Sequence, residues 1–436
     1  MNLLLFLSIF FIFSGLVAFY ITRRLLGMTS LSRLRKLAVA AGIVVIFWIS
    51  PVTMILRRNG MDNHGINALV WTGYLGLGFL SFIVTFLVIR DVLCLPAALF
   101  NKLKRMLPAN PHGKTDPAIP ENPSRRGFLV NSMNYGIMAT ASLTTGYGII
   151  EAKQVPEVKE VQIAIPALPE DFNGFRIVQV TDLHVSPTIR RPYVEKVVEV
   201  VNSLNADIFT LTGDLVDGTI SQLSDDVAPL KNIKSAQGNF FVTGNHEYYS
   251  GVIEWVTQIK RLGFSILLNE YRMITRGHGS LLLAGVTDYR GGNFLHTHRS
   301  DPIKAIAGAP AADVKILLAH QPKSIFDAAR AGFDLQISGH THGGQFYPWN
   351  LIVGLNQPFI SGLHKYKNTH IYVSRGTGYW GPPVRVGAPS EITLIKLERM
   401  VSLPGRATAK SRATPEQRVM PIGGTNNYSI RRNKYV

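Results

Sequence analysis

Hydrophobic residues divide the chain into two halves with different patterns. Long apolar stretches occupy residues 1–22, 37–56 and 67–89, and each is long enough to cross a bilayer as a helix. A fourth stretch, 127–150, has no charged residue but contains hydroxyls, two asparagines and several glycines. We expect about four transmembrane helices in a membrane region at 1–150, with a buried or surface helix as the alternative for the fourth stretch.

From about residue 155 short runs rich in Val, Ile, Leu and Phe alternate with longer amphipathic stretches, which predicts an α/β domain at 155–400. Residues 191–204 place valines on one helical face. Apolar runs that end in polar residues lie at 176–184, 207–218, 239–247, 314–320 and 335–344. The last segment, 401–436, lacks periodic apolar residues and predicts a basic, disordered tail.

The net charge of +17 lies almost entirely outside the α/β half. Residues 1–150 contain 14 Lys and Arg against 4 Asp and Glu, and 401–436 contain 7 against 1. Residues 151–400 are nearly balanced, with 24 against 23, so we expect no nucleic acid partner. The single cysteine, Cys94, excludes an intramolecular disulfide and a thiolate-rich metal site.

Basic residues between the apolar stretches predict the topology. Loop 23–36 has five basic residues, loop 57–66 has two and loop 90–126 has seven. The positive-inside rule then makes the first and third loops cytoplasmic and predicts that the α/β domain lies outside the cytoplasm. The stretch "SRRGFLV" at 124–130 is similar to the twin-arginine export motif, although two arginines can also simply flank a membrane helix.

Side chains with metal-binding chemistry follow five of the predicted strands. They are Asp182 and His184, Asp214, Asn245 and His246, His320, and finally His340 and His342. Ligands of α/β proteins gather at the carboxyl ends of strands. Each of these residues alone is better explained as a turn former, a helix cap or a buried histidine. Their coincidence at five strand ends predicts one shared metal site.

The donor types limit the metal. Carboxylate, imidazole and amide oxygen without sulfur suit Mn, Fe, Zn, Co or Ni. The sequence has no G-x-S-x-G motif for a serine nucleophile.

These motifs carry a resemblance to a known family. D-x-H at 182–184, G-D-x-x-D at 213–217, G-N-H-E at 244–247, His320 and G-H-T-H at 339–342 follow one another in the order found in calcineurin-like metallophosphoesterases. The resemblance covers roughly 175–395 and includes a closing segment at 374–397. With the apolar stretches, it is closest to the membrane-anchored bacterial YkuE/YaeI-like subgroup. It implies two packed β-sheets flanked by helices.

The resemblance also implies roles for the individual residues. Asp182, His184 and His342 would hold one ion, Asn245, His320 and His340 the other, and Asp214 would bridge the two. His246 would donate a proton to the leaving oxygen or stabilise the phosphoryl group, and Asp217 would orient His246 or cap a helix. Glu247, Tyr248 and Gln345 are expected either to contact the substrate or to be solvated.

The sequence therefore predicts a membrane-anchored phosphoesterase with two metal ions that turn water into a nucleophilic hydroxide. A phosphodiester or a lipid-linked (pyro)phosphate is the expected substrate. A phosphomonoesterase or nucleotide phosphatase of the same fold is the alternative, and a non-catalytic, metal-stabilised membrane module is less favoured. A transporter is disfavoured because the apolar stretches show no internal repeat and almost no charge.

Overall fold

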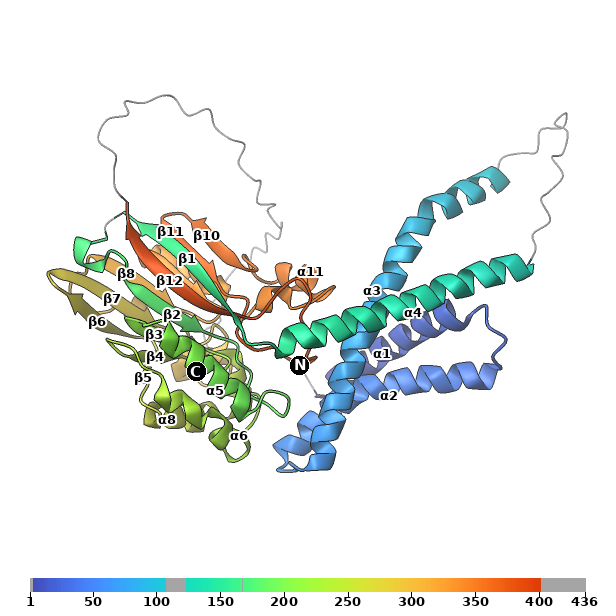
Figure 1. The fold of residues 1–436 in the computed structure, drawn as a ribbon, viewed down its shortest axis with the longest axis horizontal. Coiled ribbons are helices and arrows are strands. Elements are labelled where there is room, and N and C mark those ends of the chain that lie inside the picture. The colour runs from blue at the N-terminus through green and yellow to red at the C-terminus, as the bar shows by residue number, and fades with distance from the viewer. Residues whose placement is uncertain (1–2, 107–122, 167, 401–436) are drawn as a thin grey trace, which may run out of the picture. The chain divides into compact units, whose positions relative to one another are not determined.

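The computed structural model describes residues 3–106, 123–166 and 168–400 (Figure 1). The predicted tail at 401–436 lies outside these residues. Long helices form the N-terminal part: α1 (Leu3–Leu26), α2 (Arg33–Arg58), α3 (His64–Met106) and α4 (Pro123–Lys153). Within the described ranges, three segments are long and apolar enough to cross a membrane, Leu7–Leu26, Arg33–Arg58 and His64–Pro96. Helix α4 is not among them, so a fourth span stays a prediction.

The long helices pack through an apolar core that also includes residues from the C-terminal half of the chain. Ile21 of α1, Ile43 of α2 and Leu80 of α3 are buried there together with Phe346 and Val384. This core therefore joins the apolar helices to two loops of the α/β domain.

The first sheet of the α/β domain has six strands in the order β1-β12-β2-β3-β4-β5. The strands are β1 (Glu157–Ile165), β12 (Glu391–Arg399), β2 (Arg176–Val180), β3 (Ile208–Thr212), β4 (Asn239–Val242) and β5 (Ser265–Ile266). Strands β2, β3, β4 and β5 run parallel to one another, so their carboxyl ends lie at one edge. Strand β12 is antiparallel to β2 and parallel to β1.

The second sheet also has six strands, in the order β10-β11-β9-β8-β7-β6. They are β10 (Gly362–Tyr366), β11 (Thr369–Val373), β9 (Leu335–Ser338), β8 (Val314–Leu318), β7 (Gly279–Gly285) and β6 (Glu270–Arg276). Strands β7, β8, β9 and β11 are parallel, whereas β6 and β10 pair antiparallel at the two edges.

The two sheets pack face to face. Ile177 and Ile208 of the first sheet share a buried core with Ile316 and Ile337 of the second. The other face of the first sheet is covered by α5 (Arg191–Ser203), α6 (Ile220–Val227) and α8 (Val252–Arg261), as Figure 1 shows. The other face of the second sheet packs against α9 (Pro302–Ala305) and α10 (Ile325–Arg330). The predicted α/β architecture of two packed sheets flanked by helices is therefore confirmed.

Candidate metal centre

The predicted site residues lie at the carboxyl ends of parallel strands from both sheets. Asp182 and His184 follow β2, Asp214 and Asp217 follow β3, and Asn245 opens helix α7 (Asn245–Ser250) after β4. His320 follows β8, and His340 and His342 follow β9. Because the sheets are packed together, the ends of these strands converge and bring side chains separated by up to 160 positions into one place.

The backbone at the site adopts a conformation that side-chain-bearing residues rarely use. Five of the candidate ligands have positive φ: Asp182 at 54°, His184 at 50°, Asp214 at 53°, His340 at 74° and His342 at 52°. Nine non-glycine residues of the described chain share this property, so more than half of them belong to the site. Such strain costs roughly 1–3 kcal/mol per residue and persists where the surrounding structure enforces it.

Glycines next to the ligands allow the close approach of neighbouring segments. A Cβ on Gly244 would lie 2.2 Å from Oδ1 of Asp214, and a Cβ on Gly339 would lie 2.2 Å from Oδ2 of Asp182. Neither position accepts any other residue without moving a carboxylate. The glycines of the G-N-H-E and G-H-T-H motifs are therefore required by the packing of the site.

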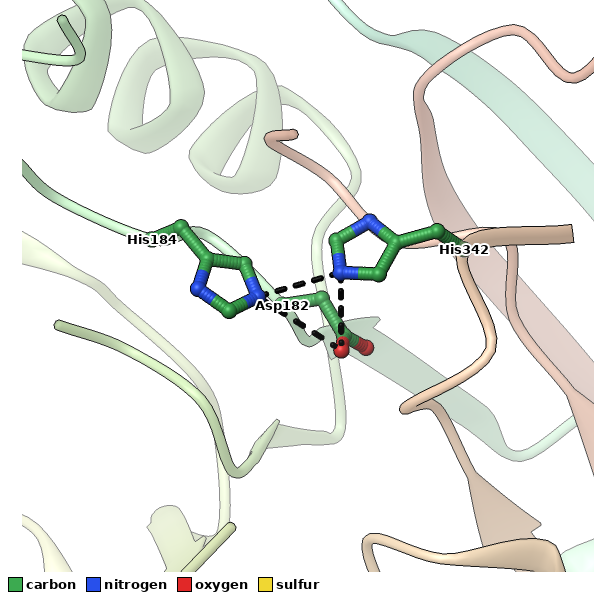
Figure 2. A group of neighbouring side chains, drawn as sticks. All are labelled: Asp182, His184 and His342. Atoms are coloured by element: carbon green, nitrogen blue, oxygen red, sulfur yellow. Dashed lines mark hydrogen bonds and ion pairs between the residues drawn. The ribbon is translucent and has the colours of Figure 1, made fainter. Parts of the chain in front are cut away.

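Asp182, His184 and His342 form one group of potential ligands (Figure 2). Figure 2 shows the two imidazoles and the carboxylate pointing toward a common centre. Nε2 of His184 and Nε2 of His342 are 3.0 Å apart, and Oδ1 of Asp182 lies 3.9 Å and 3.4 Å from these two nitrogens. The three side chains are buried.

Asp214, His320 and His340 form a second group. Oδ2 of Asp214 is 3.0 Å from Nε2 of His320, and Nδ1 of His340 is 3.2 Å from the same His320 nitrogen. Oδ2 of Asp214 also lies 3.8 Å from Nε2 of His184 in the first group. The carboxylate of Asp214 thus stands between the two groups, at the position that a bridging ligand requires.

The residues fit a pair of bound cations. Oδ1 of Asn245 is buried and has no hydrogen-bond partner among the described residues, although a buried amide oxygen normally has one. Two pairs of histidine nitrogens face each other at 3.0 and 3.2 Å, an arrangement that needs a proton or a cation between the lone pairs. The buried carboxylates and imidazoles of the two groups, without sulfur, are the donor set expected for divalent transition metals.

His246 and Asp217 lie beside the two groups. Nδ1 of His246 is 2.5 Å from Oδ1 of Asp217, and Nδ1 of His184 is 3.2 Å from the same oxygen. These three residues form a further cluster of potential ligands, but His184 uses its other nitrogen, Nε2, toward His342. Asp217 therefore orients the rings of His184 and His246, and Nε2 of His246 stays directed toward Asp214 at 4.0 Å.

The electrostatics of the site differ from residue to residue. Burial lowers the pKa of His246, but Asp217 and Asp214 oppose it and raise the pKa to about 9. Burial and the neighbouring His320 lower the pKa of His340 to about 3. Burial, His184 and Arg385 likewise hold the pKa of His342 well below its usual range. His340 and His342 are therefore neutral at physiological pH, which is the form of imidazole that binds metal.

Three residues for which a solvated side chain was one of the two expectations are buried, so that alternative was wrong for Glu247, Tyr248 and Gln345. Glu247 is fully buried, and its carboxylate accepts hydrogen bonds from the backbone N–H groups of Asp214, Leu215 and Gly244 at 2.7–3.0 Å. It therefore fixes the loop that carries Asp214 to the start of α7.

Tyr248 and Gln345 are also buried and bonded within the protein. The hydroxyl of Tyr248 is 2.8 Å from Nδ1 of His298. The amide nitrogen of Gln345 donates to the carbonyl oxygens of Trp380 and Pro382, and its amide oxygen accepts from the N–H of Trp380. Gln345 thus ties the G-H-T-H loop to segment 378–388.

Sequence reasoning missed Arg385, whose guanidinium is fully buried. It donates to the carbonyl oxygens of Gly378, Ala388 and Arg375, and Nη2 lies 3.2 Å from Nδ1 of His342. Arg385 therefore braces the ring of a candidate ligand from behind. A signal was present in the sequence, because a lone arginine in the apolar, glycine-rich run "GPPVRVGAP" has no acidic neighbour to pair with.

Known proteins share these features. The model of the calcineurin-like phosphoesterase family matches residues 175–344, which include all the candidate ligands. An uncharacterized metallophosphoesterase of Helicobacter pylori is 38% identical over 280 residues, which cover 63% of this chain and 73% of that protein. The chain belongs to the calcineurin-like metallophosphoesterase family. The uncharacterized metallophosphoesterase YkuE of Bacillus subtilis is 30% identical over 294 residues, covering 63% of this chain and 98% of YkuE.

Another metallophosphoesterase relative carries membrane helices according to its name. The zebrafish "Transmembrane protein with metallophosphoesterase domain" is 37% identical over 271 residues, which cover 60% of this chain and 62% of the zebrafish protein. The aligned part is thus less than two thirds of that relative. With the three apolar helices described above, the likeness is consistent with membrane association of this metallophosphoesterase.

Proposed function

We propose that the chain is a membrane-anchored, metal-dependent phosphoesterase that hydrolyses a phosphodiester or a lipid-linked (pyro)phosphate. The observation that carries the proposal is the convergence of six histidine and aspartate side chains from four strand ends into two neighbouring groups of potential metal ligands. A structural role alone would not require the positive φ values of five of these residues.

Each group of the site has a task in this proposal. Asp182, His184 and His342 hold one ion, and Asn245, His320 and His340 hold the other, with Asp214 shared. Two divalent ions would supply an activated water and neutralise charge on the phosphoryl oxygens. The protein keeps these ligands in place through Glu247 and Arg385, which bind the loops that carry them.

His246 supplies the proton. Its Nδ1 is held by Asp217, which leaves Nε2 to donate to the oxygen of the departing alcohol or to a phosphoryl oxygen. The side chain is only 13% exposed, and the rings of Tyr249 and Trp380 contact it at 5.1 and 5.7 Å between ring centroids. These two rings restrict water around the proton donor.

We place the catalytic domain, residues 155–400, outside the cytoplasm and anchor it through the membrane region at 1–150. Support comes from the apolar helices and from the basic residues of the loops at 23–36 and 90–126. The twin-arginine-like stretch at 124–130 agrees with export of a folded, metal-loaded domain across a bacterial inner membrane.

The test uses the full-length protein in detergent and a chromogenic diester, bis(p-nitrophenyl) phosphate. We expect hydrolysis with added Mn²⁺, loss of hydrolysis with a chelator, and two bound metal ions per chain by elemental analysis. His184→Ala and His342→Ala should lose metal and activity together. A metal-loaded protein that hydrolyses neither this diester nor p-nitrophenyl phosphate would sink the proposal and favour the non-catalytic, metal-stabilised module.

The same assay distinguishes a phosphodiesterase from the alternative, a phosphomonoesterase or nucleotide phosphatase of the same fold. A phosphomonoesterase or nucleotide phosphatase would act on p-nitrophenyl phosphate or on a nucleoside monophosphate in preference to the diester. The ratio of kcat/KM for the diester and the monoester therefore decides between the two substrate classes.

A further inference from the structure

Polar side chains of helices α1, α3 and α4 contact one another at a single position along the helix axes. The hydroxyl of Tyr20 donates to Asp91, and the guanidinium of Arg24 lies 2.8 Å from the same carboxylate. Arg90 donates to the amide oxygen of Asn134 at 2.7 Å, and the amide nitrogen of Asn134 donates back to the carbonyl oxygen of Arg24. Because such groups avoid hydrocarbon, this cluster marks one boundary of the apolar layer.

The opposite boundary lies one bilayer thickness away on two helices. Trp71 precedes Arg90 by 19 residues on α3, and Lys153 follows Asn134 by 19 residues on α4, a rise of about 29 Å in each case. Trp71 and Lys153 meet there, with the ammonium 4.5 Å from the centre of the indole ring. A hydrocarbon core is about 30 Å thick, and Trp and Lys are typical of its edges.

The α/β domain contacts the helices between the two boundaries, the one at Arg90 and Asn134 and the one at Trp71 and Lys153. Phe346 packs on Phe82 with 5.6 Å between ring centroids, and Phe82 is about 12 Å along α3 from Arg90. Val384 packs against Gly78 of α3 and Gly148 of α4. A Cβ on Gly78 would lie 3.2 Å from a methyl group of Val384, and a Cβ on Gly148 would lie 2.5 Å from the other. Both loops of the catalytic domain therefore reach the depth of the hydrocarbon.

The chain that follows Phe346 is suited to lipid. Residues 345–363 contain no charged side chain. Segment 346–355, which includes helix α11 (Trp349–Gly354), exposes large apolar side chains: Tyr347 50%, Trp349 46%, Leu351 64%, Ile352 47% and Leu355 76%. A patch of aromatic and aliphatic side chains without charge is unusual on a surface that faces water and typical of segments in a bilayer interface.

The same elements form the rim of the metal centre. Trp380, which is 55% exposed, contacts the ring of His246 and is bonded to Gln345, the residue that precedes segment 346–355. The ring of Tyr249 also contacts His246, and the backbone carbonyl of Tyr249 accepts a hydrogen bond from Arg58 at the end of α2. The proton donor thus contacts two aromatic residues, one bonded to a membrane helix and one bonded to the residue before segment 346–355.

We propose that segment 346–355 is embedded in the bilayer and that the site hydrolyses the phosphate ester of a membrane lipid that reaches it from the bilayer. The inference rests on the proposed function and names its substrate class. Water adds its oxygen to phosphorus and releases one proton to solvent, and the P–O bond to the leaving group breaks. The leaving oxygen, of an alcohol or of a phosphate in a pyrophosphate, takes a proton from His246, which regains one from water. The depth of the segment lets the acyl chains stay in hydrocarbon while the phosphate lies at the headgroup level.

Embedding is tested with a fluorophore on a single cysteine. In the full chain with Cys94→Ser, Leu355→Cys is labelled with an environment-sensitive dye and reconstituted in nanodiscs. Ile303→Cys on α9, which is similarly exposed at 58%, is the matched control. We expect blue-shifted emission and quenching by spin-labelled lipids at 355 but not at 303. Water-like emission at 355 would overturn the proposal.

Substrate access is tested with the same nanodiscs containing phosphatidic acid, phosphatidylglycerol and a polyprenyl pyrophosphate, with lipid products measured by mass spectrometry. We expect the wild type to hydrolyse at least one of these lipids. Leu351→Glu with Leu355→Glu should reduce lipid hydrolysis at least tenfold but change hydrolysis of bis(p-nitrophenyl) phosphate less than twofold. Ile253→Glu with Ile303→Glu, two exposed residues on α8 and α9, should change neither rate.

The outcomes distinguish the lipid inference from the phosphoesterase proposal on which it rests. Hydrolysis of the soluble diester without hydrolysis of any of the three lipids overturns the lipid inference and leaves the phosphoesterase proposal intact. Equal losses on lipid and soluble substrate in the Leu351 and Leu355 variant also overturn it, because the segment would then support the fold and not lipid access. Absence of hydrolysis of every substrate defeats the phosphoesterase proposal itself.

Discussion

His246 is the residue at which metal binding and turnover can be separated. Its Nδ1 is bonded to Asp217, whereas the ligand groups on either side are complete without it. We expect His246→Gln to retain both metals and to lower kcat by about 10²–10⁴-fold, the usual contribution of a positioned proton donor. Elemental analysis and steady-state kinetics measure the two effects. His278→Gln, an exposed histidine in the turn after β6, is the control, and full activity of His246→Gln would refute its role.

Glu247 stabilises the site through the backbone. It is fully buried and accepts three backbone N–H groups, and burial with the nearby Asp214 raises its pKa to about 7. In Glu247→Gln one oxygen becomes an NH₂ group that faces N–H donors. We expect a loss of about 1–3 kcal/mol in the free energy of unfolding, measured by thermal denaturation of the metal-free protein. Glu254→Gln on the exposed side of α8 should leave the unfolding temperature unchanged.

At the residue scale, the candidate ligands could be predicted from the sequence, whereas the residues that position them could not be predicted as well. Asp182 and His340 stand directly after apolar strands, so their type and position could be predicted. Glu247 binds N–H groups of the loop at 214–215, and Arg385 lies against His342; although the lone arginine stands out in its apolar run, no local pattern indicates these distant partners. The positive φ of the ligands is imposed by tertiary packing, and the sequence shows it only as a choice of Asp and His, which tolerate this conformation better than most residues do.

At the element scale, periodicity predicts elements better than their pairing. Helix α5 begins at Arg191 and buries the expected valine face, and strands β2, β3, β4, β8 and β9 lie where apolar runs predict them. The insertion of β12 between β1 and β2 was not predictable, because it joins segments more than 200 residues apart. Helix α3 runs to Met106, well beyond the apolar stretch that ends at residue 89, since helix-forming residues continue after the hydrophobic ones.

Helix α4 is coupled to the metal centre through Gly148. Its carbonyl oxygen accepts the N–H of Arg385, and a Cβ there would lie 2.5 Å from Val384 and 3.0 Å from Val386. In Gly148→Val the loop must move and withdraw Arg385 from His342. We expect metal affinity to fall about 10–100-fold, as for other residues that orient a ligand. Metal titration measures it, with Gly146→Val as the control, because no atom lies within 4 Å of that Cβ. Equal affinities in the two variants would contradict the coupling.

At the scale of the whole molecule, the distribution of charge predicts where the catalytic domain lies. The excess of basic residues beside the apolar helices predicts that the domain at 155–400 lies outside the cytoplasm. We expect alkaline phosphatase fused after residue 155 to be active. A fusion in loop 23–36 is the control and should be inactive. A cytoplasmic signal after residue 155 would contradict both the loop charges and the export motif.

The export signal can be distinguished from a simple charged flank because Lys and Arg carry the same charge. Arg125 and Arg126 lie in the first turn of α4, directly before the uncharged residues 127–150, and lysine satisfies the positive-inside rule as well as arginine does. Twin-arginine recognition requires the guanidinium pair. Arg125→Lys with Arg126→Lys should therefore retain the catalytic domain in the cytoplasm, as protease protection in spheroplasts would detect, whereas Arg33→Lys with Arg35→Lys should not. Normal export of the first variant would mean that the two arginines act only as a charged boundary of the helix.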